Sequence, residues 1–230
     1  MNESDSYYEE VMYPLQNGVL KTLAACETPF YLTGGTALHR HHFGYRYSDD
    51  LDFFVNRDSS FGRYVDIALA ALQDKGYRFD PDAFVRNEQY ARVLVIKQSA
   101  TLKIDFIDDS APRFGPLISG ELFPRIDTLR NILSNKVTSV YRMESKHIAD
   151  LWAICNHECF LWADILTEAN EKEVGIDAAT VADLVRSFPK HLVDTILWRE
   201  QPPVDLFLSG LATMATDLLL VRKNSLYIGH

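Results

Sequence analysis

Residues 30–54 read FYLTGGTALHRHHFGYRYSDDLDFF, and this stretch decides the fold. Residues 30–33 form the short apolar run of a strand, and two glycines follow it directly. Because glycine lets the backbone turn sharply, we expect Gly34–Gly35 to lead the chain into a short helix over residues 36–43. Residues 51–55 are nearly all apolar, which predicts a second strand in the middle of a sheet.

The segments on either side continue the alternation of strands and helices. Apolar spacing predicts helices at residues 14–26 and 61–73, and strands at 83–87, 92–97 and 101–107, the last two as a hairpin. From about residue 126 the spacing is helical, with breaks near 142–143, 156–157, 175, 189 and 202–203. This order predicts an α+β fold: a mixed β-sheet with flanking helices in residues 1–115, followed by a C-terminal helical domain in residues 116–230 that contributes to the cleft.

The composition is that of a folded globular protein. The 230 residues are 47% hydrophobic and 24% charged, with 23 Lys and Arg against 32 Asp and Glu, a net charge of −9. No apolar run is long enough to span a membrane, the first ten residues are acidic rather than signal-like, and the three cysteines are an odd number. We therefore expect a cytoplasmic protein with reduced thiols and no membrane partner.

Two carboxylates mark the start of the second strand. Asp50 and Asp52 are two residues apart, so the alternation of a strand projects both from one face of the sheet. Two carboxylates that close resist ionising together, and a hard divalent cation such as Mg²⁺ or Mn²⁺ relieves the repulsion. The alternative is a solvated surface pair at the end of a strand.

Two further features favour a metal and phosphate site over the surface pair. The glycine turn precedes a helix whose free N–H groups can hold phosphate, with Thr36 adding a hydroxyl or acting only as an N-cap. Asp105 is an acid inside a later apolar strand, where an unpaired charge is costly. We expect Lys103 to point away from Asp105, and the sequence leaves the exposure of Asp105 open. Three such acids make two-metal phosphoryl transfer plausible.

The residues around these motifs resemble a known family. Residues 30–38 and 46–54 are similar to the AbiEii/AbiGii-type toxin nucleotidyltransferases of the DNA polymerase beta-like superfamily, whose pattern is Gly-[Gly/Ser]-[Ser/Thr], an Asp-x-Asp and a third Asp on a neighbouring strand. The resemblance covers roughly residues 28–155. It implies a nucleotidyltransferase-like sheet, with Asp105 as the third acid. The family also has a lysine-bearing helix and a later Lys/Arg-Asp pair, which Lys136 and Asp150 resemble, although here Lys146 and Asp150 are three residues further apart.

A basic window fits the same interpretation. Residues 125–150 hold five basic side chains (Arg125, Arg130, Lys136, Arg142 and Lys146) against three acidic ones (Asp127, Glu144 and Asp150). Arg142, Lys146 and Asp150 are spaced by four, so we expect them on one helix face, and Lys136 as an exposed cation that reaches a phosphate. The alternative is a solvated face with weak ion pairs.

The resemblance implies a function and a set of site residues. The function is Mg²⁺-dependent transfer of a nucleotide from a nucleoside triphosphate to an acceptor hydroxyl, on the 3′ end of tRNA or on a protein, by the toxin of a bacterial toxin–antitoxin or abortive-infection system with its cognate antitoxin. The implied metal ligands are Asp50, Asp52 and Asp105, which are also catalytic together with Lys136 and Asp150. The implied nucleotide-binding residues are Gly34, Gly35, Thr36, Arg46, Ser48, Arg142 and Lys146.

Other interpretations stay open at this level. The same fold could serve as a catalytically idle module that binds a nucleotide or a protein. Arg142 and His147 match the loose Arg-x(4)-His pattern of HEPN-type ribonucleases, which cleave RNA without metal. Cys155 and Cys159 lack the second ligand pair of a zinc site, so we expect both to be small core residues on one helix.

Overall fold

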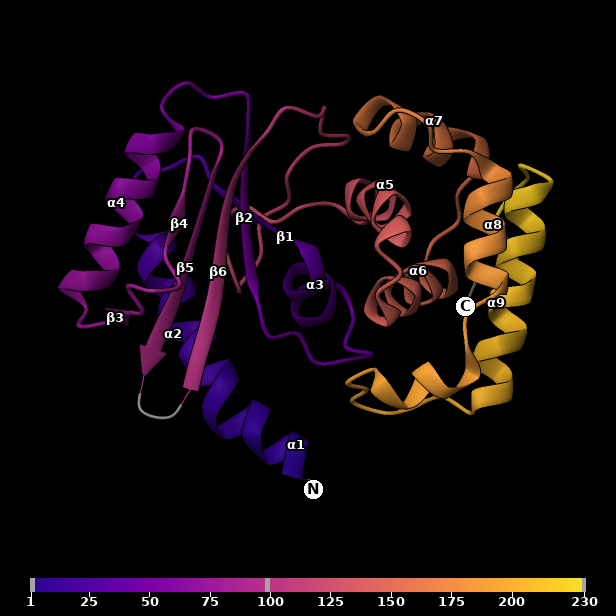
Figure 1. The fold of residues 1–230 in the computed structure, drawn as a ribbon, viewed down its shortest axis with the longest axis horizontal. Helices are drawn as coiled ribbons and strands as arrows, with labels where there is room; N and C mark the ends of the chain where they lie inside the picture. Colours follow the sequence, from indigo (N-terminus) through magenta and orange to yellow (C-terminus); the bar gives the residue numbers. More distant parts are fainter. Residues whose placement is uncertain (1–2, 98–99, 229–230) are drawn as a thin grey trace. The chain divides into compact units, whose positions relative to one another are not determined.

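The structure is a computed structural model that describes residues 3–97 and 100–228. The chain forms two compact units (Figure 1). Unit 1 comprises Met1–Ser110 and Pro116–Thr128, and unit 2 comprises Ala111–Gly115 and Leu129–His230. The division into domains at residues 115 and 116 stays a prediction. No helix of the described ranges is long and apolar enough to cross a membrane.

Unit 1 is built on a six-stranded mixed sheet, which confirms the predicted fold class. Its strands are β1 (Tyr31–Thr33), β2 (Leu51–Asn56), β3 (Arg78–Phe79), β4 (Val85–Arg86), β5 (Tyr90–Lys97) and β6 (Ala100–Asp109). The order is β1-β2-β6-β5-β3, with β4 also paired to β5. Only β2 and β6 run parallel among these pairs, and the others are antiparallel. The turn of the predicted β5–β6 hairpin, Gln98 and Ser99, lies outside the described residues.

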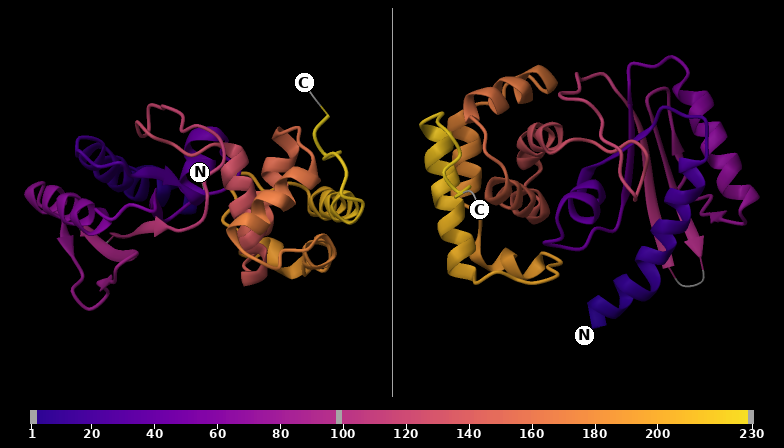
Figure 2. Two further views of the ribbon diagram at one scale, coloured as in Figure 1. Left: turned by 90° about the horizontal axis from the view of Figure 1, so that it is seen from above. Right: turned by 180° about the vertical axis from the view of Figure 1, so that it is seen from behind.

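One face of the sheet is the core of unit 1. Burial alternates along β2 and β5, as expected where one face is packed and the other carries polar groups. The rings of Phe53 and Phe106 stack on neighbouring strands with centroids 5.6 Å apart, and Phe30 packs between Phe106 and Phe61. Phe61 begins α4 (Phe61–Asp74), which lies with α2 (Tyr13–Ala24) on the same side of the sheet (Figures 1 and 2).

Unit 1 has two further helical segments, and we predicted the one after the glycine turn but not the one at the N-terminus. α3 (Gly34–Ala37) continues directly into a π-helical turn, η2 (Leu38–His42), where we expected one short helix. At the N-terminus, α1 (Glu3–Tyr7) continues into a second π-helical turn, η1 (Tyr8–Met12). Tyr8, Val11 and Met12 have the i, i+3, i+4 spacing of one helix face, and Tyr8 and Met12 are buried.

The named elements of unit 2 within the described residues are all helices. They are α5 (Leu129–Ser139), η3 (Val140–Arg142), α6 (Ser145–His157), α7 (Trp162–Lys172), α8 (Ala178–Arg186), η4 (Lys190–Thr195) and α9 (Val204–Leu219). α8 and α9 run side by side (Figure 2), and Phe207 of α9 packs against Trp152 of α6 and against Trp198. The break predicted at residues 142–143 is present, because Met143 takes a left-handed conformation with φ 56°.

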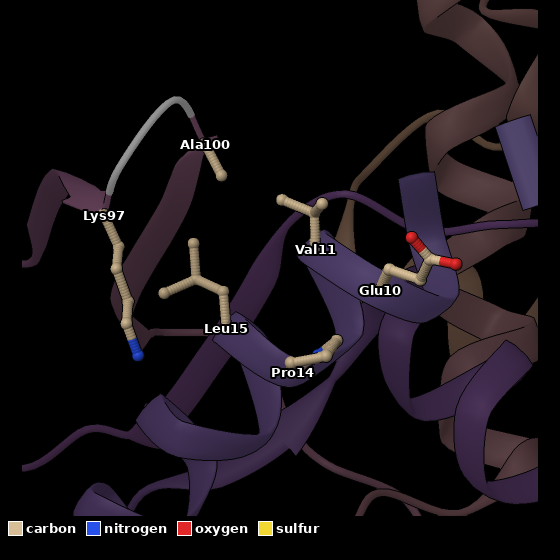
Figure 3. Close-up of a pocket in the computed structure, with 6 residues that line it drawn as sticks. All are labelled: Glu10, Val11, Pro14, Leu15, Lys97 and Ala100. Carbon is tan, nitrogen blue, oxygen red and sulfur yellow. The ribbon is translucent and has the colours of Figure 1, made fainter. Parts of the chain in front are cut away.

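A small pocket of ≈ 200 Å³ lies between the start of α2 and the hairpin end of β5 and β6 (Figure 3). It is lined by Glu10, Val11, Pro14, Leu15, Lys97 and Ala100. Ala100 precedes Asp105 by five strand residues, a rise of roughly 16 Å. The pocket therefore lies away from the predicted acidic residues.

Candidate functional site

A row of polar side chains crosses four strands on the face of the sheet opposite the aromatic core. Thr33 of β1 pairs in register with Asp52 of β2, Asp52 with Asp105 of β6, and Asp105 with Arg92 of β5. Residues that pair in register project from the same face of a sheet. The two acids are therefore direct neighbours although they lie 53 positions apart in the sequence. We call these four residues the cross-strand row.

Asp50 joins this row through a lysine. Lys103 Nζ lies 2.6 Å from Asp50 Oδ2 and 3.5 Å from Asp105 Oδ2. The expectation that Lys103 points away from Asp105 was wrong: the two residues are two apart on β6, and the period of a strand places them on one face. Burial opposes the charge on Lys103, but the carboxylates outweigh it and raise the pKa of the ammonium. Lys103 therefore stays charged.

Asp105 is held by a clamp of three donors. Arg92 Nε and Tyr90 Oη each lie 2.8 Å from Asp105 Oδ1, and Arg92 Nη2 lies 3.3 Å from Oδ2. Burial alone would raise the pKa of Asp105, but Arg92, Tyr90 and Lys103 together hold it below its usual value. Burial and the bond to Asp105 raise the pKa of Tyr90 to about 12. Asp105 is thus a buried, ionised and rigidly oriented carboxylate.

The glycine turn fits closely around Asp52. Gly34 has φ +69°, a conformation that L side chains rarely adopt, and it opens α3. A Cβ built on residue 34 would overlap Asp52 Oδ2 and lie 3.0 Å from Asp52 Cγ. The Asp52 carboxylate therefore occupies the space that a side chain at position 34 would need, at the positive end of a helix.

The other residues predicted to bind the nucleotide beside the turn, Thr36, Arg46 and Ser48, are buried. Thr36 is fully buried, and its hydroxyl donates to the carbonyl of Asp50 and lies 3.1 Å from Ser48 Oγ, within hydrogen-bond distance. Ser48 and Arg46 are also buried, and a Cβ on Gly35 would lie within 3.0 Å of both side chains. A bulky residue at position 35 would therefore disturb this packing as well as any ligand. These contacts tie the helix α3 to the segment that carries Asp50.

The N-terminal segment supports the same stretch from the other side. Tyr8 donates a hydrogen bond to Asp49 Oδ1, and its ring stacks on Tyr47 at 4.0 Å. Gln16 of α2 donates to the carbonyls of Ser48 and Asp49 at 2.8 and 3.1 Å. The chain leading into the two acids is therefore fixed by elements that no local sequence signal connects to it.

In unit 2 the predicted lysine and aspartate form a buried pair. Lys136 Nζ of α5 lies 2.6 Å from Asp150 Oδ2 of α6, and these side chains are 8% and 0% exposed. The expectation of an exposed Lys136 was wrong, since its ammonium pairs with Asp150. The neighbouring His147 is buried, and its ring nitrogens have no hydrogen-bond partner among residues 3–97 and 100–228. Burial and the nearby Lys136 lower the pKa of His147 to about 3, so it is neutral at pH 7.

The other basic residues of the window do not share a helix face. Arg142 ends η3, Met143 interrupts the helix, and Lys146 belongs to α6, where it pairs with Glu144 at 2.8 Å. The prediction of one helix face was therefore wrong for Arg142, whereas Lys146 and Asp150 do lie four residues apart on α6. The two residues of the HEPN-type pattern differ in exposure, because Arg142 is exposed and His147 is buried.

The two cysteines that invited a zinc interpretation have different surroundings. Cys155 is a core residue whose Sγ lies 3.4 Å from the sulfur of Met214. Cys159 follows the end of α6 and is exposed, so the expectation that both would be core residues on one helix was wrong for Cys159.

The carboxylates of Asp50, Asp52 and Asp105 are of the ligand type that binds divalent cations. Within residues 3–97 and 100–228, no group of three His, Cys, Asp or Glu side chains converges closely enough to enclose a metal ion. Asp50 and Asp105 converge instead on the ammonium of Lys103, so a positive charge already lies between them. Carboxylate oxygens are the ligands that Mg²⁺ and Mn²⁺ prefer. The donor set therefore suits such a cation in place of the ammonium.

Sequence reasoning missed three side chains of this site: Tyr90, Arg92 and Lys103 in its role as a bridge. Arg92 and Tyr90 alternate with apolar residues on β5, so their face was predictable, but the register that pairs Arg92 with Asp105 was not.

Comparisons with known proteins give the family of this chain and the similarity of its fold to solved structures. The family model described as nucleotidyl transferase AbiEii toxin, type IV toxin–antitoxin system, matches residues 19–203. The fold is similar to that of JHP933 from Helicobacter pylori, with a TM-score of 0.56, 18% identity, and 95% of this chain and 93% of that chain covered. An H. pylori chain named as a candidate nucleotidyltransferase gives a TM-score of 0.54 and 19% identity, with 95% and 96% covered. No curated protein matches the chain by sequence.

Proposed function

Because the chain belongs to the nucleotidyl transferase AbiEii toxin family, we propose that it transfers a nucleotide from a nucleoside triphosphate to an acceptor hydroxyl with the help of Mg²⁺ or Mn²⁺. The observation that carries the proposal is the parallel register that places Asp52 beside Asp105, with Asp50 linked to both through Lys103. Three carboxylates on one sheet face, next to a glycine turn, are the parts that phosphoryl transfer needs.

Asp50, Asp52 and Asp105 would hold the divalent cation, which when bound neutralises charge on the phosphates as they react. Gly34 and Gly35 have no side chain to cover the start of α3, so their backbone can approach the β- and γ-phosphates. Thr36, Arg46 and Ser48 are buried, and they contribute by fixing the turn and the chain before Asp50. We therefore assign them as positioning residues.

Asp105 would orient the acceptor. Its clamp by Arg92 and Tyr90 fixes the direction of the carboxylate, and its lowered pKa keeps it ionised at neutral pH. An ionised carboxylate accepts a hydrogen bond from the acceptor hydroxyl. The hydroxyl oxygen then attacks the α-phosphorus, the bond to the bridging oxygen breaks, and pyrophosphate leaves with that electron pair. The hydroxyl proton passes to Asp105 or to water.

The family resemblance also implies cations for the triphosphate among residues 136–150. Asp150 fixes the ammonium of Lys136, and Arg142 and Lys146 are exposed and carry positive charge. We propose that these residues offset phosphate charge during the reaction. In the cell, the family implies a toxin that acts on the 3′ end of tRNA or on a protein hydroxyl and is restrained by a cognate antitoxin.

The test is transfer of label from each α-labelled nucleoside triphosphate, with Mg²⁺, to total cell RNA and to cell protein. We expect one macromolecule to gain label, and Asp52→Asn to lower the rate by roughly 10²-fold or more. Asp74→Asn, an exposed acid in the last turn of α4, is the matched control and should transfer as the wild type does. Nucleotide binding without any transfer would instead support the idle binding module.

A further inference from the structure

Lys103 is the cation of this site that can move. Its side chain is 29% exposed, and it contacts Asp50 and Asp105 through a single ammonium on a flexible stem. Arg92, the cation of the cross-strand row, is fixed by its two-point contact with Asp105. Of these two cations, Lys103 is therefore the one that can leave the carboxylates without breaking the clamp on Asp105.

The ammonium of Lys103 competes with a metal ion for the same oxygens. A divalent cation held by Asp50 and Asp105 would take the place of the Lys103 ammonium, which lies 2.6 Å from Asp50 Oδ2 and 3.5 Å from Asp105 Oδ2. Two positive charges at that spacing in a half-buried site repel each other strongly. Metal binding to the free protein must therefore displace a charge that the site already uses.

A displaced ammonium needs a new anion. The three carboxylates and two cations of Asp50, Asp52, Asp105, Arg92 and Lys103 sum to a charge of −1, so a divalent cation alone would leave the cluster at +1. A nucleoside triphosphate brings several negative charges on oxygens that an ammonium recognises as a point charge. The stem of Lys103 allows its ammonium to move to such an oxygen while the backbone of β6 stays in the sheet.

We propose that Lys103 couples the binding of the metal to the binding of the nucleotide, by leaving Asp50 and Asp105 for a phosphate oxygen when both ligands are bound. This inference rests on the proposed function and deepens it. In the free protein the ammonium keeps the carboxylates occupied and metal affinity low. Once the phosphate accepts the ammonium, each ligand raises the affinity for the other, as the reciprocity of linked equilibria requires.

The test measures Mn²⁺ binding directly by electron paramagnetic resonance on the full chain, with and without a non-hydrolysable α,β-methylene nucleotide analogue. Lys103→Met removes the charge and keeps most of the stem, and Lys103→Gln is a second variant if the first does not fold. Lys97→Met removes one charge from the same sheet at its hairpin end, and is the matched control. Melting temperature establishes that each variant is folded.

We expect Lys103→Met to bind Mn²⁺ alone more tightly than the wild type and than Lys97→Met, by roughly tenfold or more, within the range of couplings between sites. The gain in Mn²⁺ affinity on adding the analogue should shrink by a similar factor. Equal Mn²⁺ affinities for folded Lys103→Met and Lys97→Met would overturn the coupling and leave the proposed function intact. A wild-type protein that binds no Mn²⁺, with or without the analogue, would overturn both.

Discussion

Gly34→Ala tests the close packing of the glycine turn against the Asp52 side chain. The substitution adds one methyl group at a residue with φ +69°, where the methyl would overlap Asp52 Oδ2. Gly76→Ala is a matched control in the same unit: Gly76 has φ +80°, and a Cβ there meets no atom within 4 Å. The two variants share the backbone strain, and only the first displaces a carboxylate.

The expected magnitudes follow from these geometries. The left-handed conformation costs an alanine about 1–2 kcal/mol at either position. At position 34 the Asp52 side chain must also leave its favoured rotamer, which adds about 0.5–1.5 kcal/mol. A displacement of about 1 Å at a reacting centre costs on the order of 10²-fold in rate. We therefore expect Gly34→Ala to be about 1 kcal/mol less stable than Gly76→Ala and to lose most nucleotide transfer, which Gly76→Ala retains.

Urea denaturation gives the free energy of unfolding, and the labelled-nucleotide assay gives the rate. A Gly34→Ala variant made in an Asp52→Ala background should lose only the strain that Gly76→Ala loses, because the overlapping carboxylate is gone. If Gly34→Ala transfers nucleotide within threefold of Gly76→Ala, roughly the scatter of ordinary surface variants, the reasoning is refuted. Equal destabilisation by Gly34→Ala with and without Asp52 would refute the contact itself.

Two further predictions concern unit 2. Lys136→Met removes the ammonium that pairs with the buried Asp150 carboxylate, and it should cost about 3–5 kcal/mol of unfolding free energy. Lys190→Met removes an exposed ammonium and should cost less than about 1 kcal/mol. Similar free energies of unfolding for the two variants in urea would contradict a buried pair. His147 has a folded pKa of about 3, below its unfolded value, so its neutral form contributes stability that is complete above about pH 7 and is lost as the pH falls below about 6.5. Between pH 7 and pH 5 the wild type should lose about 2 kcal/mol more than His147→Leu, and parallel stability curves for the two proteins would show that His147 is not buried neutral.

The local part of the site could be predicted from the sequence. The strand, the glycine turn and the next strand appear where the pattern of residues 30–55 places them, and the family resemblance built on them is confirmed. Asp50 and Asp52 follow from the period of a strand. The same period predicts that Lys103 and Asp105, two residues apart on β6, lie on one face of the sheet. The expectation that Lys103 points away from Asp105 did not apply this period.

The remaining parts depend on contacts between distant segments. The pairing of Asp52 with Asp105 requires β2 and β6 to align in parallel across a long connection, and no local signal sets that register. The clamp of Asp105 by Arg92 depends on the register of the hairpin in the same way. Lys136 appeared to be an exposed phosphate ligand because a charge in a helix is usually solvated, and only the packing of α5 on α6 shows the ammonium buried against Asp150.

The clamp on Asp105 changes how substitutions of the acids should be interpreted. The pKa of Asp105 is lower in the folded protein than in the unfolded chain, so the ionised carboxylate stabilises unit 1 at neutral pH. This stabilisation is lost as the pH falls below the pKa of the unfolded carboxyl. Removing the charge at position 105 would therefore weaken the sheet and the reaction together, since Arg92 and Tyr90 would lose their shared acceptor. The carboxylate of Asp52 instead lies against the glycine turn, where a ligand phosphate is proposed to bind. Transfer and stability therefore have to be measured on the same variant, and a loss of transfer in Asp52→Asn that is much larger than its loss of stability is the result that would assign the face of the sheet to catalysis.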